Sequence, residues 1–133
     1  MVEYRWNEPG PEAGEFLEFV QQVWPGDYDR SRTAEALDRT INLTARENGR
    51  LVGCLRILTD GYFFGTITEL LVLPEYQRRG IGRSLLELAK QNTPTMLYFG
   101  AQPEAEGFYE RSGCRKSLQS YQIEKPEDHT GRP

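Results

Sequence analysis

Apolar residues recur at helical spacing in several stretches of the chain. Phe16, Val20 and Val23 lie at positions i, i+4 and i+7, and the same spacing is repeated between Ile81 and Ala89. Side chains at these intervals share one face of a helix, which can then pack against a core. The pattern predicts four helices, which cover residues 12–24, 33–39, 81–92 and 104–112.

The second of these helices follows a polar stretch. Ser31 or Thr33 is the expected N-terminal cap, because both side chains can accept a hydrogen bond from the first turn. Ala34 and Leu37 are expected to face the core. The last helix should end at Gly113, which suits the left-handed conformation at a helix C-terminus.

Apolar runs separated by turn dipeptides predict strands. Asn48-Gly49 lies between the runs 41–47 and 50–59, and Asp60-Gly61 separates the second run from 62–73. Both dipeptides favour the positive φ angles of a tight type I′ turn. We therefore expect three antiparallel strands here, a short first strand over 4–7, later strands over 96–99 and 121–125, and one further candidate strand over 114–118.

The order of these elements predicts the fold class. The helix over 81–92 connects the strands that end at 73 and begin at 96. Such a crossover makes the two strands parallel, and the connection between them is right-handed. We expect an α/β (α+β) fold with a mixed, mostly antiparallel central sheet and helices on both faces. One domain should cover residues 1–126, and a flexible C-terminal tail should cover 127–133.

Composition limits the function classes. The 133 residues have a formal net charge of −4, which disfavours nucleic-acid binding because that requires a basic face. No apolar run is long enough to span a bilayer, and the N-terminus lacks a signal-peptide pattern. We expect a cytoplasmic protein without a nucleic-acid or membrane partner.

Cysteine and histidine are too scarce for a metal centre. Cys54 and Cys114 form neither a disulfide framework nor a ligand set, and His129 is the sole histidine. We expect no metal, and we expect both cysteines to be small buried residues rather than nucleophiles.

A strand, a glycine loop and a helix occupy residues 67–88. Pro74 ends the strand, and Gly80 and Gly82 lie at the start of the amphipathic helix. Helix N-termini carry unpaired N–H groups and partial positive charge, and glycines let an anion approach them. The loop therefore predicts a pyrophosphate site, to which its arginines add positive charge: Arg78, Arg79 and Arg83.

Spacing excludes two common phosphate loops. A Walker loop requires Lys after the second glycine, where Arg83 stands, and a dinucleotide fingerprint requires glycine at Leu85. Instead, Gln77 to Gly82 resembles the Q/R-x-x-G-x-G/A element of the GCN5-related N-acetyltransferase (GNAT) family, and Leu70 to Tyr76 resembles the strand before it. The alternative is a strand-to-helix turn whose glycines serve tight geometry alone.

This resemblance implies acetyl-CoA as cosubstrate. It also implies that the backbone of the preceding strand binds the pantetheine arm and the tetrahedral oxyanion, and that the loop holds the pyrophosphate. Gln102 stands where many relatives have an asparagine that contacts the cofactor. The implied cofactor-binding residues are Leu71, Val72, Leu73, Arg78, Arg79, Gly80, Ile81, Gly82, Arg83, Ser84 and Gln102.

A second motif lies over residues 107–114. It resembles the FYxxxGF element of the family, with Cys114 where phenylalanine is usual. In the family such a tyrosine protonates the departing thiolate, and a neutral phenol suits that task at pH 7. The resemblance assigns this role to Tyr109. The alternative is that Tyr109 only packs beside Phe108.

Glu69 is the candidate base that deprotonates the acceptor amine. It shares a strand face with Leu71 and Leu73, because side chains alternate along a strand. Some relatives carry an acid at this position, and others use one in the following strand, where Leu97 stands here. The alternative is that Glu69 only occupies an open strand face.

The resemblance implies transfer of acetyl to a primary amine by direct attack in a ternary complex. Asp27, Tyr28, Asp29 and Glu35 lie in the segment that lines the acceptor site of relatives, although a solvated polar loop explains them equally well. The acceptor is a small-molecule amine or a peptide. Exposed final strands make a homodimer plausible. Two alternatives remain: a non-catalytic acetyl-CoA-binding or sensing module, and a protein that binds another nucleotide.

Overall fold

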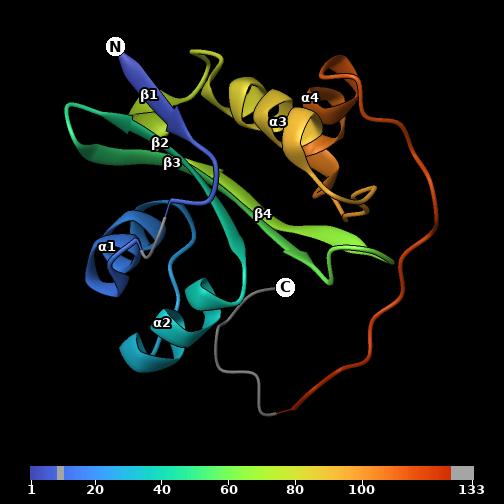
Figure 1. Cartoon of the computed structure of the whole chain (residues 1–133), viewed down its shortest axis with the longest axis horizontal. Coiled ribbons are helices and arrows are strands. Elements are labelled where there is room, and N and C mark those ends of the chain that lie inside the picture. The colour runs from blue at the N-terminus through green and yellow to red at the C-terminus, as the bar shows by residue number, and fades with distance from the viewer. Residues whose placement is uncertain (9–10, 127–133) are drawn as a thin grey trace.

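The computed structural model describes residues 1–8 and 11–126 and contains one sheet with helices packed on both faces (Figure 1). The strands are antiparallel and lie in the order β1-β2-β3-β4. Their bounds are Val2–Arg5 for β1, Ile41–Glu47 for β2, Arg50–Thr59 for β3 and Gly65–Val72 for β4. The helices are α1 (Ala13–Val23), α2 (Arg30–Asp38), α3 (Ile81–Asn92) and α4 (Glu106–Arg111), with 3-10 turns over Pro74–Tyr76 and Pro103–Ala105.

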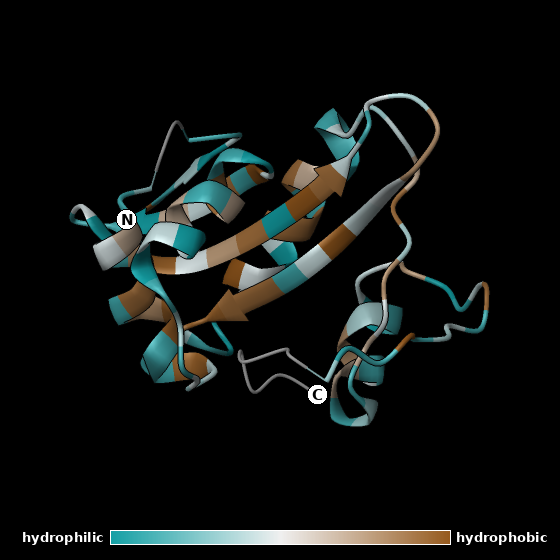
Figure 2. Cartoon of the chain, turned by 90° about the horizontal axis from the view of Figure 1, so that it is seen from below, coloured by the Kyte–Doolittle hydropathy of each residue, from teal (hydrophilic) through white to brown (hydrophobic). Residues whose placement is uncertain are grey.

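Helices α1 and α3 lie on opposite faces of the sheet. A Cβ atom at Gly53 would meet Ile81 and Leu85 of α3, whereas the Arg56 guanidinium lies over the Phe16 ring of α1. Positions 53 and 56 of one strand face opposite sides, because side chains alternate. Figure 2 shows hydrophobic residues along the strands between these helices. The expected fold class, a central sheet covered on both faces, is therefore confirmed.

The first two helices begin at acidic caps. The Glu12 carboxylate accepts hydrogen bonds from the N–H groups of Gly14 and Glu15 at the start of α1. Asp29 caps α2, because its carboxylate accepts the N–H of Arg32 at 2.9 Å. The expectation that Ser31 or Thr33 caps this helix was wrong, and α2 begins three residues earlier than predicted, at Arg30.

Within α2 one inward residue was predicted correctly. Leu37 is buried in the core, but Ala34 is exposed. The earlier start and the short length of α2 leave a single apolar position that faces the sheet.

The two predicted hairpins differ in their turns. Asn48 and Gly49 have φ angles of 51° and 81°, as a tight turn requires, and β2 and β3 end directly beside them. The β3–β4 turn is longer, because β4 starts at Gly65 and not at residue 62. The Asp60 carboxylate accepts the N–H groups of Tyr62, Phe63 and Phe64, which holds this longer turn together.

The strands predicted after α3 are missing from the described part of the chain. Residues 96–99 form one parallel bridge, between Tyr98 and Thr66, in which the Tyr98 N–H donates to the Gly65 oxygen at 3.0 Å. Residues 114–118 and 121–125 form no strand and run away from the sheet (Figure 1). The alternation of apolar and polar residues indicates which side chains would share one face of a strand. A strand forms, however, only where a neighbouring strand is available for pairing. The predicted tail over 127–133 lies outside the described residues.

No helix within the described ranges has the length and the apolar content that crossing a membrane requires.

Candidate active site

The loop between β4 and α3 presents the start of a helix at the surface. Gly80 is the N-cap of α3 with φ of 82°, and no side chain caps the first turn. A Cβ atom at Gly80 would meet nothing within 4 Å. The φ angle favours glycine, and the space beside this residue at the helix start is open.

The second glycine has a packing role that the sequence did not indicate. A Cβ atom at Gly82 would lie 3.1 Å from the Phe108 ring, so the absence of a side chain at this position makes room for α4. The contact brings α4 against the first turn of α3. The two sequence motifs, separated by about 25 residues, thus meet at one place.

The three arginines of the loop lie in different surroundings. The Arg79 guanidinium is 4.9 Å from the centre of the Tyr76 ring, which fixes it by a cation–π contact. Arg78 has a left-handed backbone with φ of 66°. Arg83 and Ser84 line an open groove of ≈ 500 Å³ together with Gly80. The positive charge predicted at this helix start is therefore present.

The outer edge of β4 offers backbone groups to a ligand. The Leu73 N–H donates to the Val52 oxygen at 2.9 Å, and the Leu73 oxygen accepts the N–H of Tyr76. Backbone direction alternates along a strand, so the groups of Leu71 also face β3, whereas those of Leu70 and Val72 face the outer edge. Within the described residues no strand pairs with that edge beyond Thr66. Of the three residues predicted to bind the cofactor through their backbone, Leu71, Val72 and Leu73, only Val72 therefore directs its backbone groups to the outer edge.

Tyr109 is a residue of α4, and its ring packs against two other aromatic rings. Its ring centre is 4.9 Å from that of Phe99 and 5.1 Å from that of Phe108. Burial raises the pKa of its phenol above the usual 10, with a smaller contribution from Cys114. Tyr109 also lines a cavity of ≈ 580 Å³ that reaches Thr66 at the edge of β4. The packing contacts therefore hold a protonated hydroxyl group beside a cavity.

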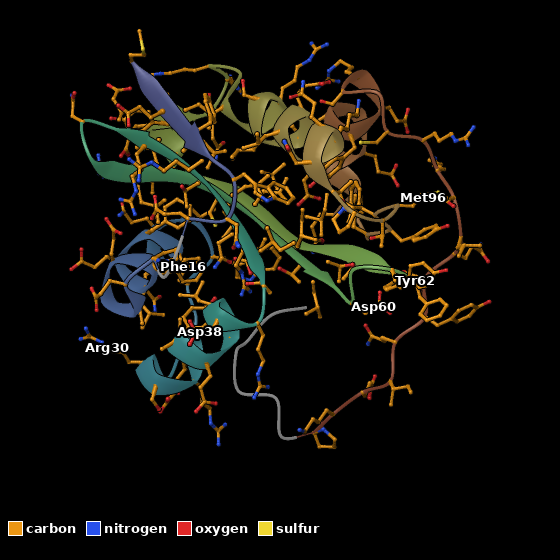
Figure 3. The ribbon with its side chains drawn as sticks, viewed as in Figure 1. Phe16, Arg30, Asp38, Asp60, Tyr62 and Met96 are labelled. Atoms are coloured by element: carbon orange, nitrogen blue, oxygen red, sulfur yellow. The ribbon has the colours of Figure 1, made fainter. Side chains whose placement is uncertain are left out.

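Glu69 is buried and forms an ion pair. Arg56 donates to one of the Glu69 carboxylate oxygens from Nη2 at 2.7 Å and from Nε at 3.2 Å. The Glu69 side chain is 3% exposed and the Arg56 side chain is 12% exposed. A register shift between Arg56 and Ile57 places an extra residue, Thr68, in β4. The bulge turns Glu69 toward the α1 face, where Figure 3 shows Phe16 beneath the sheet.

The remaining predicted residues are scattered. Gln102 precedes the turn over Pro103–Ala105, and its backbone oxygen accepts the N–H of Ala105. Of the acidic stretch before residue 41, Asp29 serves as a helix cap, and the Tyr28 hydroxyl donates to the Trp24 oxygen at 2.6 Å. Asp27 and Glu35 are exposed.

The two cysteines differ. Cys54 is buried, and burial raises the pKa of its thiol to about 12, so it is an inert core residue as expected. Cys114 is half-buried and lines the cavity beside Tyr109, so the expectation of burial was wrong for it. Among the described residues, no group of three or more His, Cys, Asp or Glu side chains is arranged to hold a metal ion.

A family model described as an acetyltransferase (GNAT) domain matches residues 38–114, which is more than half of the chain. The chain belongs to the GNAT acetyltransferase family. The matched range includes the glycine loop, the edge of β4 and Tyr109, so the resemblance drawn from the two motifs is confirmed.

Solved GNAT structures share the fold over nearly the whole chain. A GNAT family acetyltransferase from Streptococcus pneumoniae is 24% identical with a TM-score of 0.78, and the alignment covers 94% of this chain and 99% of that one. AAC(6′)-Iy, in complex with the bisubstrate analogue CoA-S-monomethyl-acetylneamine, is 16% identical with a TM-score of 0.74 and coverages of 94% and 98%. At these identities the likeness shows the fold alone.

A curated relative that carries an acetyltransferase name, from Gibberella zeae, is 40% identical over 45 residues. The aligned stretch is 34% of this chain and only 25% of that protein, so this chain matches about a quarter of its length.

Two features of this GNAT site were missed from the sequence. Arg56 is the partner of Glu69, and Phe108 fills the space at Gly82. The first depends on the bulge at Thr68, which no local pattern marks. The second depends on a contact between residues that are 26 positions apart, which no local pattern marks either.

Proposed function

We propose that this chain transfers the acetyl group of acetyl-CoA to a primary amine by direct attack in a ternary complex. The observation that carries the proposal is the contact of Phe108 with Gly82, because it joins the two motifs. The helix that carries Tyr109 thereby packs against the glycine loop, next to the open edge of β4. In this proposal the first turn of α3, the outer edge of β4 and the Tyr109 phenol serve one cofactor.

The residues of the loop fit a pyrophosphate. The first turn of α3 has no side-chain cap, and the space at Gly80 is open. Unpaired N–H groups and the helix dipole attract an anion there. We assign the pyrophosphate to this turn, from Gly80 to Ser84, with Arg78, Arg79 and Arg83 around it. Gln102 contacts the cofactor from the following loop.

The edge of β4 and Tyr109 fit the thioester end. Acetyl-CoA supplies an acetyl thioester, whose leaving group is a thiolate. The Val72 N–H faces the open edge and is the donor that we assign to the oxyanion. The Val72 oxygen, which lies in the next peptide unit, accepts the side-chain amide of Gln77 at 3.0 Å, and this bond helps to hold the backbone of Val72 in place. Tyr109 donates the proton that the thiolate takes up.

Glu69 assists the loss of a proton from the amine. Its carboxylate is held by Arg56 and is 3% exposed, so an acceptor amine reaches it through intervening hydrogen-bonded groups and not by direct contact. In this role the ion pair keeps the carboxylate charged and fixed in orientation.

The acceptor class is a cationic small-molecule amine or a peptide amine. Asp27, which precedes α2, and Glu35, which lies in α2, are exposed carboxylates and attract a positive charge. Two neighbours of the fold support this class by their names: AAC(6′)-Iy was solved with an acetylneamine analogue, and another is an aminoglycoside acetyltransferase.

Calorimetric titration with acetyl-CoA tests the cofactor site. Gly80→Glu should bind acetyl-CoA at least about tenfold more weakly than Gly80→Gln, because like charges a few ångströms apart repel by about 1–4 kcal/mol. The two variants share the same backbone strain and nearly the same shape, so they differ in charge alone. Equal affinities in the two variants would contradict an anion site at this loop.

The transfer step is tested by thiol release in the presence of a panel of amines. An amine that accelerates release from acetyl-CoA supports the enzyme. Tight acetyl-CoA binding without acceleration by any amine would contradict it and would favour a sensing module.

A further inference from the structure

The helix that carries Tyr109 is short and weakly buried. Helix α4 covers only Glu106–Arg111, and its side chains are half-buried or exposed. A helix of this length is unstable in water by itself, so contacts with the rest of the protein must hold α4 in place. The position of the Tyr109 hydroxyl group therefore depends on the contacts that α4 makes with its neighbours.

Two of these contacts join α4 to α3, which lies beside it (Figure 1). At the start of α3, the Phe108 ring fills the space beside Gly82. In the last turn of α3, the Lys90 ammonium group donates a hydrogen bond from Nζ to the backbone oxygen of Ser112 at 3.0 Å. Phe108 and Ser112 are one helical turn apart, so the two contacts hold one face of α4.

The Ser112 backbone links the Lys90 contact to Tyr109. Ser112 is 7% exposed, and its N–H donates to the backbone oxygens of Phe108 and Tyr109 at 3.0 and 3.1 Å. The Cys114 N–H donates to the same Tyr109 oxygen at 2.9 Å. Lys90 thus holds the residue whose backbone is bonded directly to that of Tyr109.

The C-terminal end of α4 suits a cation. The last carbonyl groups of a helix carry partial negative charge, which a lysine ammonium group stabilises. Gly113, with φ of 87°, leaves room for that group, since a Cβ atom there would lie 2.9 Å from Lys90 Nζ. Lys90 also lies 3.5 Å from Glu87, but these side chains are 45% and 52% exposed and the pair is screened by water. The bond to Ser112 is therefore what distinguishes Lys90 from an ordinary surface lysine.

We propose that Lys90 is a positioning residue for acetyl transfer. It fixes the C-terminal end of α4 against α3 and thereby holds the Tyr109 hydroxyl group at the leaving thiolate. This inference rests on the proposed function, in which Tyr109 donates the proton, and Lys90 itself takes no part in the chemical step. A general acid must lie within hydrogen-bond reach, and a displacement of about 1 Å can cost about 10²-fold in rate, so one contact away from the reacting atoms controls turnover.

Turnover of Lys90→Met tests this role. Methionine keeps the apolar part of the side chain and removes the ammonium group. Turnover at saturating acetyl-CoA and amine should fall at least about tenfold, because the hydroxyl group is no longer held in place. Affinity for acetyl-CoA in calorimetry should stay within about twofold, because Tyr109 acts on the leaving group.

Glu87→Gln is the matched control for this variant. It removes the other partner of Lys90 and leaves the bond to Ser112, so its turnover should be near that of the wild type. Wild-type turnover in Lys90→Met, or equal losses in Lys90→Met and Glu87→Gln, would overturn the proposal.

A double-mutant cycle with Tyr109→Phe separates positioning from a general loss of structure. Since Lys90 acts through the Tyr109 hydroxyl group, Lys90→Met should lower turnover less than about twofold further once that hydroxyl group is absent. The same factor of loss in both backgrounds would overturn the proposal, because Lys90 would then act independently of Tyr109.

Hydrogen exchange measures the attachment of α4 without any acceptor amine. The amides of Ser112 and Cys114 should exchange at least about tenfold faster in Lys90→Met, while those in the first two turns of α3 stay unchanged. Unchanged exchange at Ser112 and Cys114 would overturn the role of the Lys90 contact.

The same measurements distinguish failure of this inference from failure of the proposed function. A loss of turnover in Tyr109→Phe with none in Lys90→Met would contradict the role of Lys90 alone. No loss in Tyr109→Phe, or no transfer to any amine by the wild type, would contradict the proposed function and with it this inference.

Discussion

Tyr109→Phe should lower the turnover of acetyl transfer by about two to four orders of magnitude, the usual contribution of a positioned general acid. Phenylalanine keeps the ring contacts with Phe99 and Phe108, so the substitution removes the hydroxyl group alone. Affinity for acetyl-CoA should stay within about twofold, since the phenol acts on the leaving group. Thiol release at saturating amine measures the first quantity, and calorimetry measures the second.

Tyr98→Phe is the matched control, because Tyr98 lines the same cavity and also loses only a hydroxyl group. It should keep near-normal turnover. Similar losses in both variants, or none in Tyr109→Phe, would contradict the acid role. The pH profile gives a second check. Burial raises the pKa of Tyr109, so the phenol stays protonated, and the rate should begin to decrease through its ionisation only above pH 10.

Local signals predicted the elements that local interactions determine. Helix α3 has the predicted bounds, because its apolar spacing and the glycine before it are both encoded nearby. The Asn48-Gly49 hairpin was predicted for the same reason. The start of α2 was missed by three residues, since Asp29 competed with Ser31 and Thr33 as a cap and sequence alone does not rank them.

Non-local contacts account for what the sequence did not predict. Whether residues 121–125 form a strand depends on a neighbouring edge, and their alternation is equally compatible with an exposed segment or with a partner chain. The pairing of Arg56 with Glu69 depends on the bulge at Thr68, and the function of Gly82 depends on Phe108. The sequence therefore predicted the two motifs of the site. It did not predict the contacts that join and orient them.

Arg56→Met should destabilise the protein by about 3–5 kcal/mol, because it removes the guanidinium that pairs with a buried carboxylate. Glu69 is 3% exposed, and its paired oxygen accepts two hydrogen bonds from Arg56. Urea unfolding measures the loss. Arg50→Met is the control, since the Arg50–Glu75 pair is 52% and 54% exposed and should contribute less than about 1 kcal/mol. A loss in Arg56→Met no larger than in Arg50→Met would contradict this account of the ion pair.

The double variant Arg56→Met, Glu69→Leu separates the structural from the catalytic function of Glu69. Replacing both partners of a buried ion pair by apolar residues is often neutral or stabilising, so most of the stability lost in Arg56→Met should return. Activity should not return, because the group that assists amine deprotonation is absent. At high pH, where the free amine is abundant, the rate of the double variant should approach that of the wild type. Full activity near pH 7 in a stable double variant would mean that Glu69 serves the fold alone and that the amine loses its proton elsewhere.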